Sequence, residues 1–176
     1  MAAGRKVMLL DTDHIHGIGG DQDFVWESFF RGYNPIYMDP LGALHELTIG
    51  EPVLNEPQHE RARMAMGEAR RWAERLDLKR TLPHEELAST GYCLADPGPA
   101  YLVYVPASAS SHSTPDVSRP LTVNLTGAVG GFVGEWIDLE QSSAMPVSER
   151  IEGGGERLLT VPFRGAGLLY VYRQKD

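Results

Sequence analysis

The sequence predicts an α+β protein in two parts, and three patterns along the chain support this fold class. Residues 1–82 alternate short apolar runs with helical patterns, which is typical of β/α units. Residues 83–176 break into short β-like runs separated by turns rich in glycine and proline, which is typical of an all-β, Ig-like sandwich. The change in pattern falls between residues 78 and 88, so we expect two domains that meet near residues 82 and 83.

The first part opens with a strand, a helix and a second strand. Val7–Leu10 is wholly apolar, the pattern of a parallel strand that is buried on both faces. Pro35–Met38 is a second run of this kind. Between them, Asp21 is a favourable N-cap residue, and the aromatic-rich residues 24–30 that follow are predicted to form a short helix.

A longer helix is predicted over residues 58–76, with Pro57 in its first turn. Its apolar residues recur at spacings of three and four, which places them on one face of a helix. The other face is rich in arginine and glutamate and is expected to be solvated. The predicted apolar stripe is Ala62, Met66, Ala69, Trp72 or Ala73, and Leu76.

The second part contains six predicted strands, and one of them shows the strict alternation of a half-buried strand: Leu121, Val123 and Leu125 are separated by polar residues. Glycine and proline clusters punctuate the runs. The predicted strands are Ser89–Leu94, Tyr101–Val105, Leu121–Leu125, Phe132–Ile137, Arg157–Pro162 and Leu168–Tyr172.

Composition excludes several classes of protein. The chain has 176 residues, a formal net charge of −8 and one cysteine, Cys93, which cannot form an intrachain disulfide. The acidic balance and the lack of a basic run argue against binding to nucleic acid. No apolar run approaches the roughly 18 residues that a membrane-spanning helix needs. We therefore expect neither a nucleic-acid nor a membrane partner, and no residue pattern calls for a cofactor.

Both strands of the first part end in carboxylates. Asp11, Asp13 and His14 follow the first strand, and Asp39 follows the second. Ligands bind where the carboxyl ends of parallel strands meet, so this cluster is a candidate site. A single aspartate there could equally cap a turn, but the whole cluster with its following glycine loop favours a site.

Three chemistries could use this cluster. Paired carboxylates cleave glycosidic bonds, but Asp11 and Asp13 point to opposite faces of a strand and would each need a partner elsewhere. Phosphoryl transfer at a strand-end aspartate would need a later lysine in a suitable context, which we do not find. Asp11, Asp13, His14 and His16 could bind a divalent ion, but their spacing matches no known metal motif.

The same residues resemble part of a bacterial family. The segments that carry the resemblance are Leu9–Ile15, Gly17–Asp21, Trp26–Phe29, Arg31–Gly32 and Asn34–Pro40, together with Leu87–Leu94 and Glu135–Trp136. They look like the C-terminal part of glycoside-hydrolase-like proteins related to apiosidases. Members of this family have a (β/α)8 barrel and a C-terminal β-sandwich whose family label refers to collagen binding.

The resemblance implies roles for the strand-end residues. It places residues 1–82 at barrel strands seven and eight and makes Asp13 the first candidate for the strand-seven nucleophile, with Asp11 next. His14, His16 and Asp39 are the candidate substrate-binding residues, although the family commonly has tryptophan at the position of His16. Trp26 sits within a predicted helix and is expected to lie in the core.

The resemblance also implies an incomplete barrel. A complete barrel takes about 250 residues, whereas residues 1–82 provide two β/α units and not the strand that carries the acid/base. We therefore expect a C-terminal fragment or a truncated copy of a protein that acts on plant or bacterial glycans, inactive by itself. Exposed barrel edges predict self-association.

A different function remains open for the second part. A stand-alone β-sandwich could bind a glycan or a protein through exposed aromatic side chains, for which Tyr101, Tyr104 and Trp136 are the candidates. Burial of these three side chains in the core is the favoured interpretation, because large aromatic residues dominate protein cores.

Overall fold

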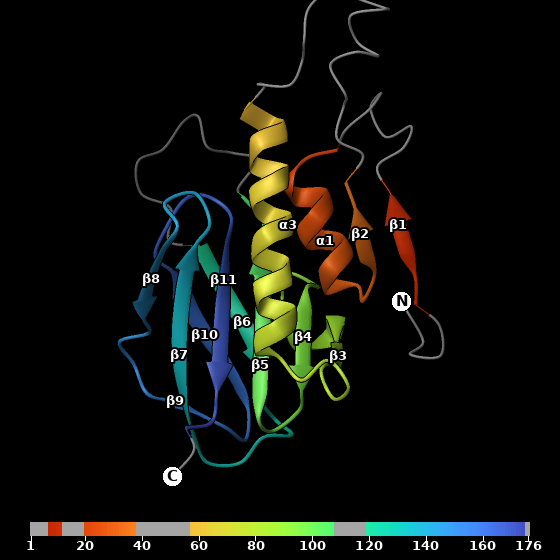
Figure 1. Cartoon of the computed structure of the whole chain (residues 1–176). Helices are drawn as coiled ribbons and strands as arrows, with labels where there is room; N and C mark the ends of the chain where they lie inside the picture. The colour runs from red at the N-terminus through yellow and green to blue at the C-terminus, as the bar shows by residue number, and fades with distance from the viewer. Residues whose placement is uncertain (1–6, 12–19, 38–56, 108–118, 175–176) are drawn as a thin grey trace, which may run out of the picture. The chain divides into compact units, whose positions relative to one another are not determined.

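The structure, a computed structural model, describes residues 7–11, 20–37, 57–107 and 119–174 (Figure 1). The chain divides into two compact units, Met1–Asp77 and Leu78–Asp176. The described residues form an α+β protein with two α-helices and mostly antiparallel sheets. The division lies slightly before the predicted boundary at residues 82 and 83, so the short β3 strand belongs to the second unit.

The first unit begins with a β–α–β segment formed by β1 (Leu9–Asp11), α1 (Gln22–Phe30) and β2 (Asn34–Ile36). The two strands pair in parallel, and Asp11 lies opposite the last residue of β2 in the register. Asp21 caps α1 as predicted, because its Oδ1 accepts a hydrogen bond from the backbone N–H of Phe24 at 2.9 Å.

The longer of the two described helices, α3 (Pro57–Arg75), packs against α1. Its buried face follows the predicted helical stripe, with Trp72 rather than Ala73 inside and Ala65 more deeply buried than Met66. The facing side of α1 is rich in aromatic residues, and Trp26 is fully buried among them. The buried residues of the two helices are Val25, Trp26, Ser28, Phe29, Phe30, His59, Ala62, Ala65, Ala69, Trp72 and Leu76.

The two parallel strands are exposed, which corrects the prediction of strands buried on both faces. Val7 and Leu9 are 76% and 64% exposed, and Ile36 is also exposed. The physical reason is that parallel strands become buried only when other elements cover both of their faces. Among the described residues, β1 and β2 form a sheet of two strands with each other alone.

The described residues of the second unit form nine strands and one short 3-10 helix, η2 (Glu85–Leu87). One sheet has the order β3-β4-β5-β11-β7-β8, with β9 pairing to β7, and the other consists of β10 and β6. The strands are β3 (Leu82–Pro83), β4 (Cys93–Asp96), β5 (Ala100–Val105), β6 (Arg119–Asn124), β7 (Gly131–Asp138), β8 (Ser143–Pro146), β9 (Ile151–Glu152), β10 (Glu156–Val161) and β11 (Gly167–Tyr172).

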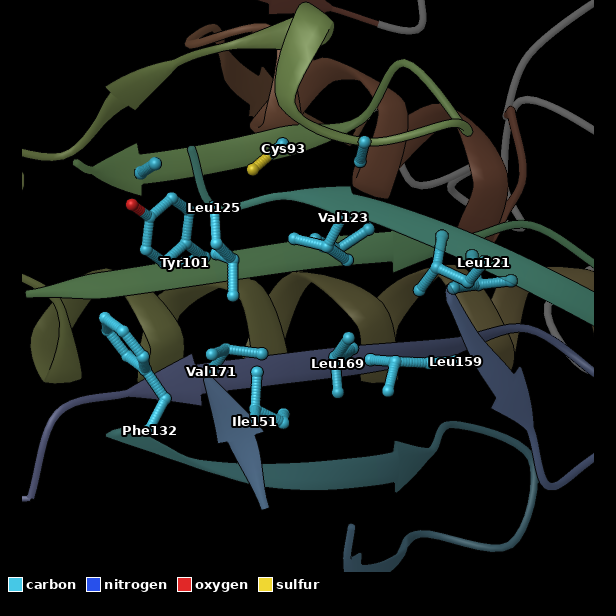
Figure 2. Close-up of a cluster of buried hydrophobic side chains, with 14 of the residues drawn as sticks. Cys93, Tyr101, Leu121, Val123, Leu125, Phe132, Ile151, Leu159, Leu169 and Val171 are labelled. Carbon is cyan, nitrogen blue, oxygen red and sulfur yellow. The ribbon is translucent and has the colours of Figure 1, made fainter. Parts of the chain in front are cut away.

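One hydrophobic core joins the two sheets of this unit (Figure 2). The larger sheet contributes alternate side chains of its central strands, such as Tyr101 and Val103 on β5 and Leu169 on β11. The smaller sheet contributes Leu121 on β6 and Leu159 on β10 to the same cluster, and Leu159 lies beside Leu169 in Figure 2. On β6, the burial of Leu121 and Val123 between less buried residues confirms the alternation predicted for that strand.

Candidate functional site

The candidate site lies at the carboxyl edge of the β1–β2 pair. Because the strands are parallel, the segments that follow Asp11 and Ile36 both begin at this edge. Asp11 is exposed there and makes further interactions within the chain. The other predicted site residues, Asp13, His14, His16 and Asp39, lie outside the described residues.

A tyrosine–histidine pair adjoins the same edge. Tyr37 directly follows β2, and its hydroxyl is hydrogen-bonded to Nδ1 of His59 in the first turn of α3. The two rings are inclined at 47°, with their centroids 6.2 Å apart. His59 is buried, so its ring is held within the unit. This hydrogen bond ties the carboxyl end of β2 to the amino end of α3.

Sequence reasoning assigned no role to His59. A signal was nevertheless present, because His59 lies three residues before Ala62 and extends the same apolar stripe of the helix. A buried histidine on such a stripe needs a polar partner, and Tyr37 supplies one. The pair can hold the end of β2 in place.

No metal site is found in the described part of the chain, where no three histidine, cysteine or acidic side chains are grouped to hold an ion. The described helices also include none that is long and apolar enough to cross a membrane.

The three aromatic side chains of the second unit that were candidates for ligand binding are not exposed. Tyr101, Tyr104 and Trp136 are all buried, in agreement with the favoured interpretation of these side chains as core residues. The Tyr101 hydroxyl accepts a hydrogen bond from the backbone N–H of Gly98 at 2.9 Å. Burial raises the pKa of the Cys93 thiol to about 12, which leaves it neutral and unreactive.

Arg119 is the charged side chain with the most extensive role in this unit. Its guanidinium donates hydrogen bonds to the backbone carbonyls of Arg164 and Gly165, at 2.7 and 2.8 Å, and to that of Pro106. Burial lowers the pKa of this guanidinium from its ordinary value. All these contacts join segments next to the ends of strands, so Arg119 stabilises the connections between them.

The solved structures that are similar to this chain include two glycoside hydrolases. A chain described as a glycoside hydrolase has a TM-score of 0.63 at 12% identity, over 88% of this chain and 37% of that chain. A glycoside hydrolase of family 5 from Bacteroides vulgatus has a TM-score of 0.58 at 11% identity, over 86% of this chain and 35% of that chain. No protein-family profile and no curated protein matches the chain.

At these identities the similarity concerns the fold alone. The chain spans little more than a third of each glycoside hydrolase. Its fold is therefore like that of a portion of larger glycoside-hydrolase chains.

Proposed function

We propose that this chain is the C-terminal part of a glycoside-hydrolase-like protein of the apiosidase-like family. In this proposal residues 1–82 are the last two β/α units of its barrel, and residues 83–176 are an accessory, Ig-like β-sandwich. One observation carries the proposal: β1 and β2 pair in parallel, and in the sequence an aspartate lies at or soon after the end of each strand. The fold similarity to parts of two glycoside hydrolases supports it.

The strand-end residues take the roles that the family resemblance implies. Asp13 is the proposed nucleophile, with Asp11 as the alternative, and His14, His16 and Asp39 are proposed to bind the sugar. The register supports this grouping, because Asp11 lies opposite Ile36 and only a few residues separate each of them from the remaining candidates. The Tyr37–His59 hydrogen bond would fix the end of β2, from which Asp39 follows.

Hydrolysis requires more than these residues provide. A retaining glycosidase needs a second carboxyl group about 5 Å from the nucleophile to act as acid and base. In the family this group stands on barrel strand four, which residues 1–82 do not supply. The chain by itself is therefore proposed to be inactive, and a plant or bacterial glycan is the proposed substrate of the longer protein.

Two experiments test the proposal. The purified chain is assayed on aryl glycosides and plant polysaccharides, and no turnover above the blank is expected. The DNA upstream of the codon for Met1 is sequenced, and an in-frame region encoding further β/α units is expected. Turnover by the chain alone that Asp13→Asn abolishes would refute the claim that it is inactive.

The matched activity test uses the longer polypeptide. Asp13→Asn in that polypeptide is expected to lower turnover by about a thousandfold or more, since it removes the nucleophile. Glu149→Gln, at an exposed position in the second unit, should leave the rate unchanged. Equal activity of the two variants would show that Asp13 is not the nucleophile.

A further inference from the structure

The sheets of the second unit differ in how well their edges are protected against pairing with another chain. In the described part of the chain, the larger sheet ends in β3 on one side and in β8 and β9 on the other, and the longest of these strands has four residues. The outer edge of β6 is covered by Ser89, whose N–H donates to the carbonyl of Thr122 at 2.9 Å. Short or covered edges hinder pairing. In contrast, β10 has six residues in unbroken register with β6.

The outer edge of β10 is open. Thr122 lies opposite Leu158 in the register of β6 and β10, but its N–H and carbonyl both bond to Ser89, at 3.0 and 2.9 Å. In an antiparallel pair, two residues at such a position both direct their backbone groups outward. The N–H and carbonyl of Leu158 therefore point away from β6, as do those of Glu156 and Thr160. No hydrogen bond on this side joins Leu158 or Thr160 to another residue of the described ranges.

The side chains along this edge also favour pairing. Leu158 is 71% exposed near the middle of the strand, and Glu156 and Thr160 on either side of it are exposed. Leu159, on the other face, is buried in the core and holds the strand in place. Exposed edge strands with apolar side chains pair readily with further strands, because backbone hydrogen bonds and apolar burial are both gained.

We propose that the chain forms a dimer in which β10 pairs antiparallel with β10 of a second copy, about a two-fold axis at Leu158. In this register Leu158 lies opposite Leu158 of the second copy, and Glu156 lies opposite its Thr160. Each of these pairs exchanges two backbone hydrogen bonds. The carbonyl of Glu156 also accepts a bond from the Arg157 guanidinium at 2.8 Å, and its second lone pair remains for the new strand.

The residues that flank the axis select this register. A shift in one direction would place Glu156 opposite Pro162 of the second copy, which has no N–H to donate. A shift in the other direction would place Arg157 opposite Arg157 of the second copy, and like charges directly opposite each other destabilise a sheet. Pairing centred on Leu158 avoids both conflicts. The strand therefore complements itself, which is why we assign this edge to a second copy.

The dimer joins the two β6–β10 pairs into one sheet with the order β6-β10-β10-β6. It follows the two-fold symmetry that is commonest among soluble homo-oligomers, in which each copy uses the same surface. The contact is small for a stable dimer, so we expect a dissociation constant of about 10–500 µM. This inference goes beyond the proposed function, because no residue of the proposed glycosidase site takes part and its test involves no hydrolysis.

Sedimentation equilibrium of the full chain over a dilution series tests the proposal. The expected result is a dimer at the highest concentrations that dissociates on dilution. Leu158→Lys is expected to weaken the dimer by about tenfold or more, because two like charges then meet at the axis. The matched control is Val129→Lys, since Val129 is 79% exposed in the same unit and lies outside β10. It should leave association unchanged.

A mixing experiment guards against a variant that merely misfolds. Leu158→Glu alone should weaken the dimer as Leu158→Lys does. An equimolar mixture of the two variants should associate at least as well as the parent chain, because opposite charges then meet at the axis. Circular dichroism checks that each variant is folded.

Disulfide cross-linking tests the register. In a Cys93→Ala background, Leu158→Cys should form a covalent dimer under mild oxidation, because residues of a hydrogen-bonded antiparallel pair have Cα atoms about 5.5 Å apart, within reach of a disulfide. Glu156→Cys is the control, since its two copies lie at opposite ends of the contact and should cross-link about tenfold or more slowly. A mixture of Glu156→Cys with Thr160→Cys should cross-link as Leu158→Cys does.

Three outcomes would overturn the proposal. One is a chain that stays monomeric up to about 1 mM, well above the expected dissociation constant; the edge of β10 would then be left for a different partner. Another is a dimer that Leu158→Lys leaves intact, because such a dimer forms through another surface. The third is equal cross-linking of Leu158→Cys and Glu156→Cys, which would exclude a two-fold axis at Leu158.

Discussion

Cys93 illustrates how burial controls the chemistry of a single residue. Its thiol has a pKa raised from 9.0 to about 12 by loss of solvation in the core of the second unit. Only the thiolate is a good nucleophile. We expect the native chain to react with a disulfide reagent at pH 8 about a hundredfold or more slowly than the denatured chain, as measured by absorbance of the released thiol.

The matched control places a thiol on the surface. Ser148→Cys in a Cys93→Ala background should react at the rate of the denatured chain, since Ser148 is exposed. The raised pKa of Cys93 also affects stability. Because the folded chain holds the thiol proton more tightly than the unfolded chain, this contribution to the free energy of unfolding is present below pH 9 and is lost as the pH rises toward 12. Rapid labelling of native Cys93 would contradict its burial.

Gly153 lies where the neighbouring backbone leaves no room for a Cβ atom. A Cβ at this position would lie 2.5 Å from the backbone oxygen of Ala128, and its own N–H donates to the carbonyl of Gly130 at 2.8 Å. Gly153→Ala must therefore move one backbone segment away from another, and it is expected to destabilise the chain by about 1–3 kcal/mol.

Urea unfolding followed by circular dichroism measures this loss. Gly127→Ala is the control, because a Cβ there meets nothing within 4 Å and the backbone is not in the left-handed region. It should stay within about 0.5 kcal/mol of the parent chain. Equal urea midpoints for the two alanine variants would show that the backbone near Gly153 moves to accommodate a Cβ without loss of stability.

At the level of residues, the site at the carboxyl edge of β1 and β2 stays a prediction, and the Tyr37–His59 hydrogen bond was not predicted. Asp11 was selected because it ends an apolar run, which is a local signal. His59 and Tyr37 are 22 positions apart and meet only through the packing of β2 and α3. A local pattern carries no information about such a contact, although the position of His59 on the apolar stripe indicated burial.

Local sequence patterns also predicted only some of the strands. The strands β5, β7 and β11 were predicted, since their apolar or alternating residues are typical of a sheet that faces a core. The strand β8 was missed, because Ser143–Pro146 has low β-propensity and forms through pairing with β7. Only the end of the predicted strand Ser89–Leu94 is extended, and its first residues form a turn.

The link between β2 and α3 can be tested through its hydrogen bond. Tyr37→Phe removes the hydroxyl that bonds the buried Nδ1 of His59. Loss of a partner for a buried polar group costs about 1–2 kcal/mol. We expect this loss in the unfolding free energy of the first unit, followed by tryptophan fluorescence, to which Trp26 and Trp72 of that unit contribute.

Tyr33→Phe provides the control within the same unit, and it should change the unfolding free energy by no more than about 0.5 kcal/mol. The NMR resonances of the His59 ring should also shift in Tyr37→Phe and not in Tyr33→Phe. A Tyr37→Phe chain as stable as the parent would mean that this hydrogen bond does not anchor β2 to α3.

At the scale of the whole molecule, the sequence predicted the two-part organisation because periodicity changes from helical to strand-like along the chain. It did not predict that β1 and β2 would be exposed. An apolar run indicates what a strand would bury in a complete sheet, whereas its actual burial depends on the elements present around it. The exposed strands agree with the small share of each glycoside hydrolase that the chain spans.

The second unit holds its entire two-sheet core within residues 78–176, since every member of the core lies between Ala88 and Val171. We therefore expect a polypeptide of residues 78–176 to fold cooperatively, with a single sharp urea transition and a protected Cys93 thiol. A matched polypeptide of residues 98–176 lacks β3 and β4, and with them the core residues Cys93 and Ala95. It should show no cooperative transition, because removal of a strand opens the core to water. If residues 78–176 also lacked a transition, the second unit would depend on the first for its stability and would not be an independent domain.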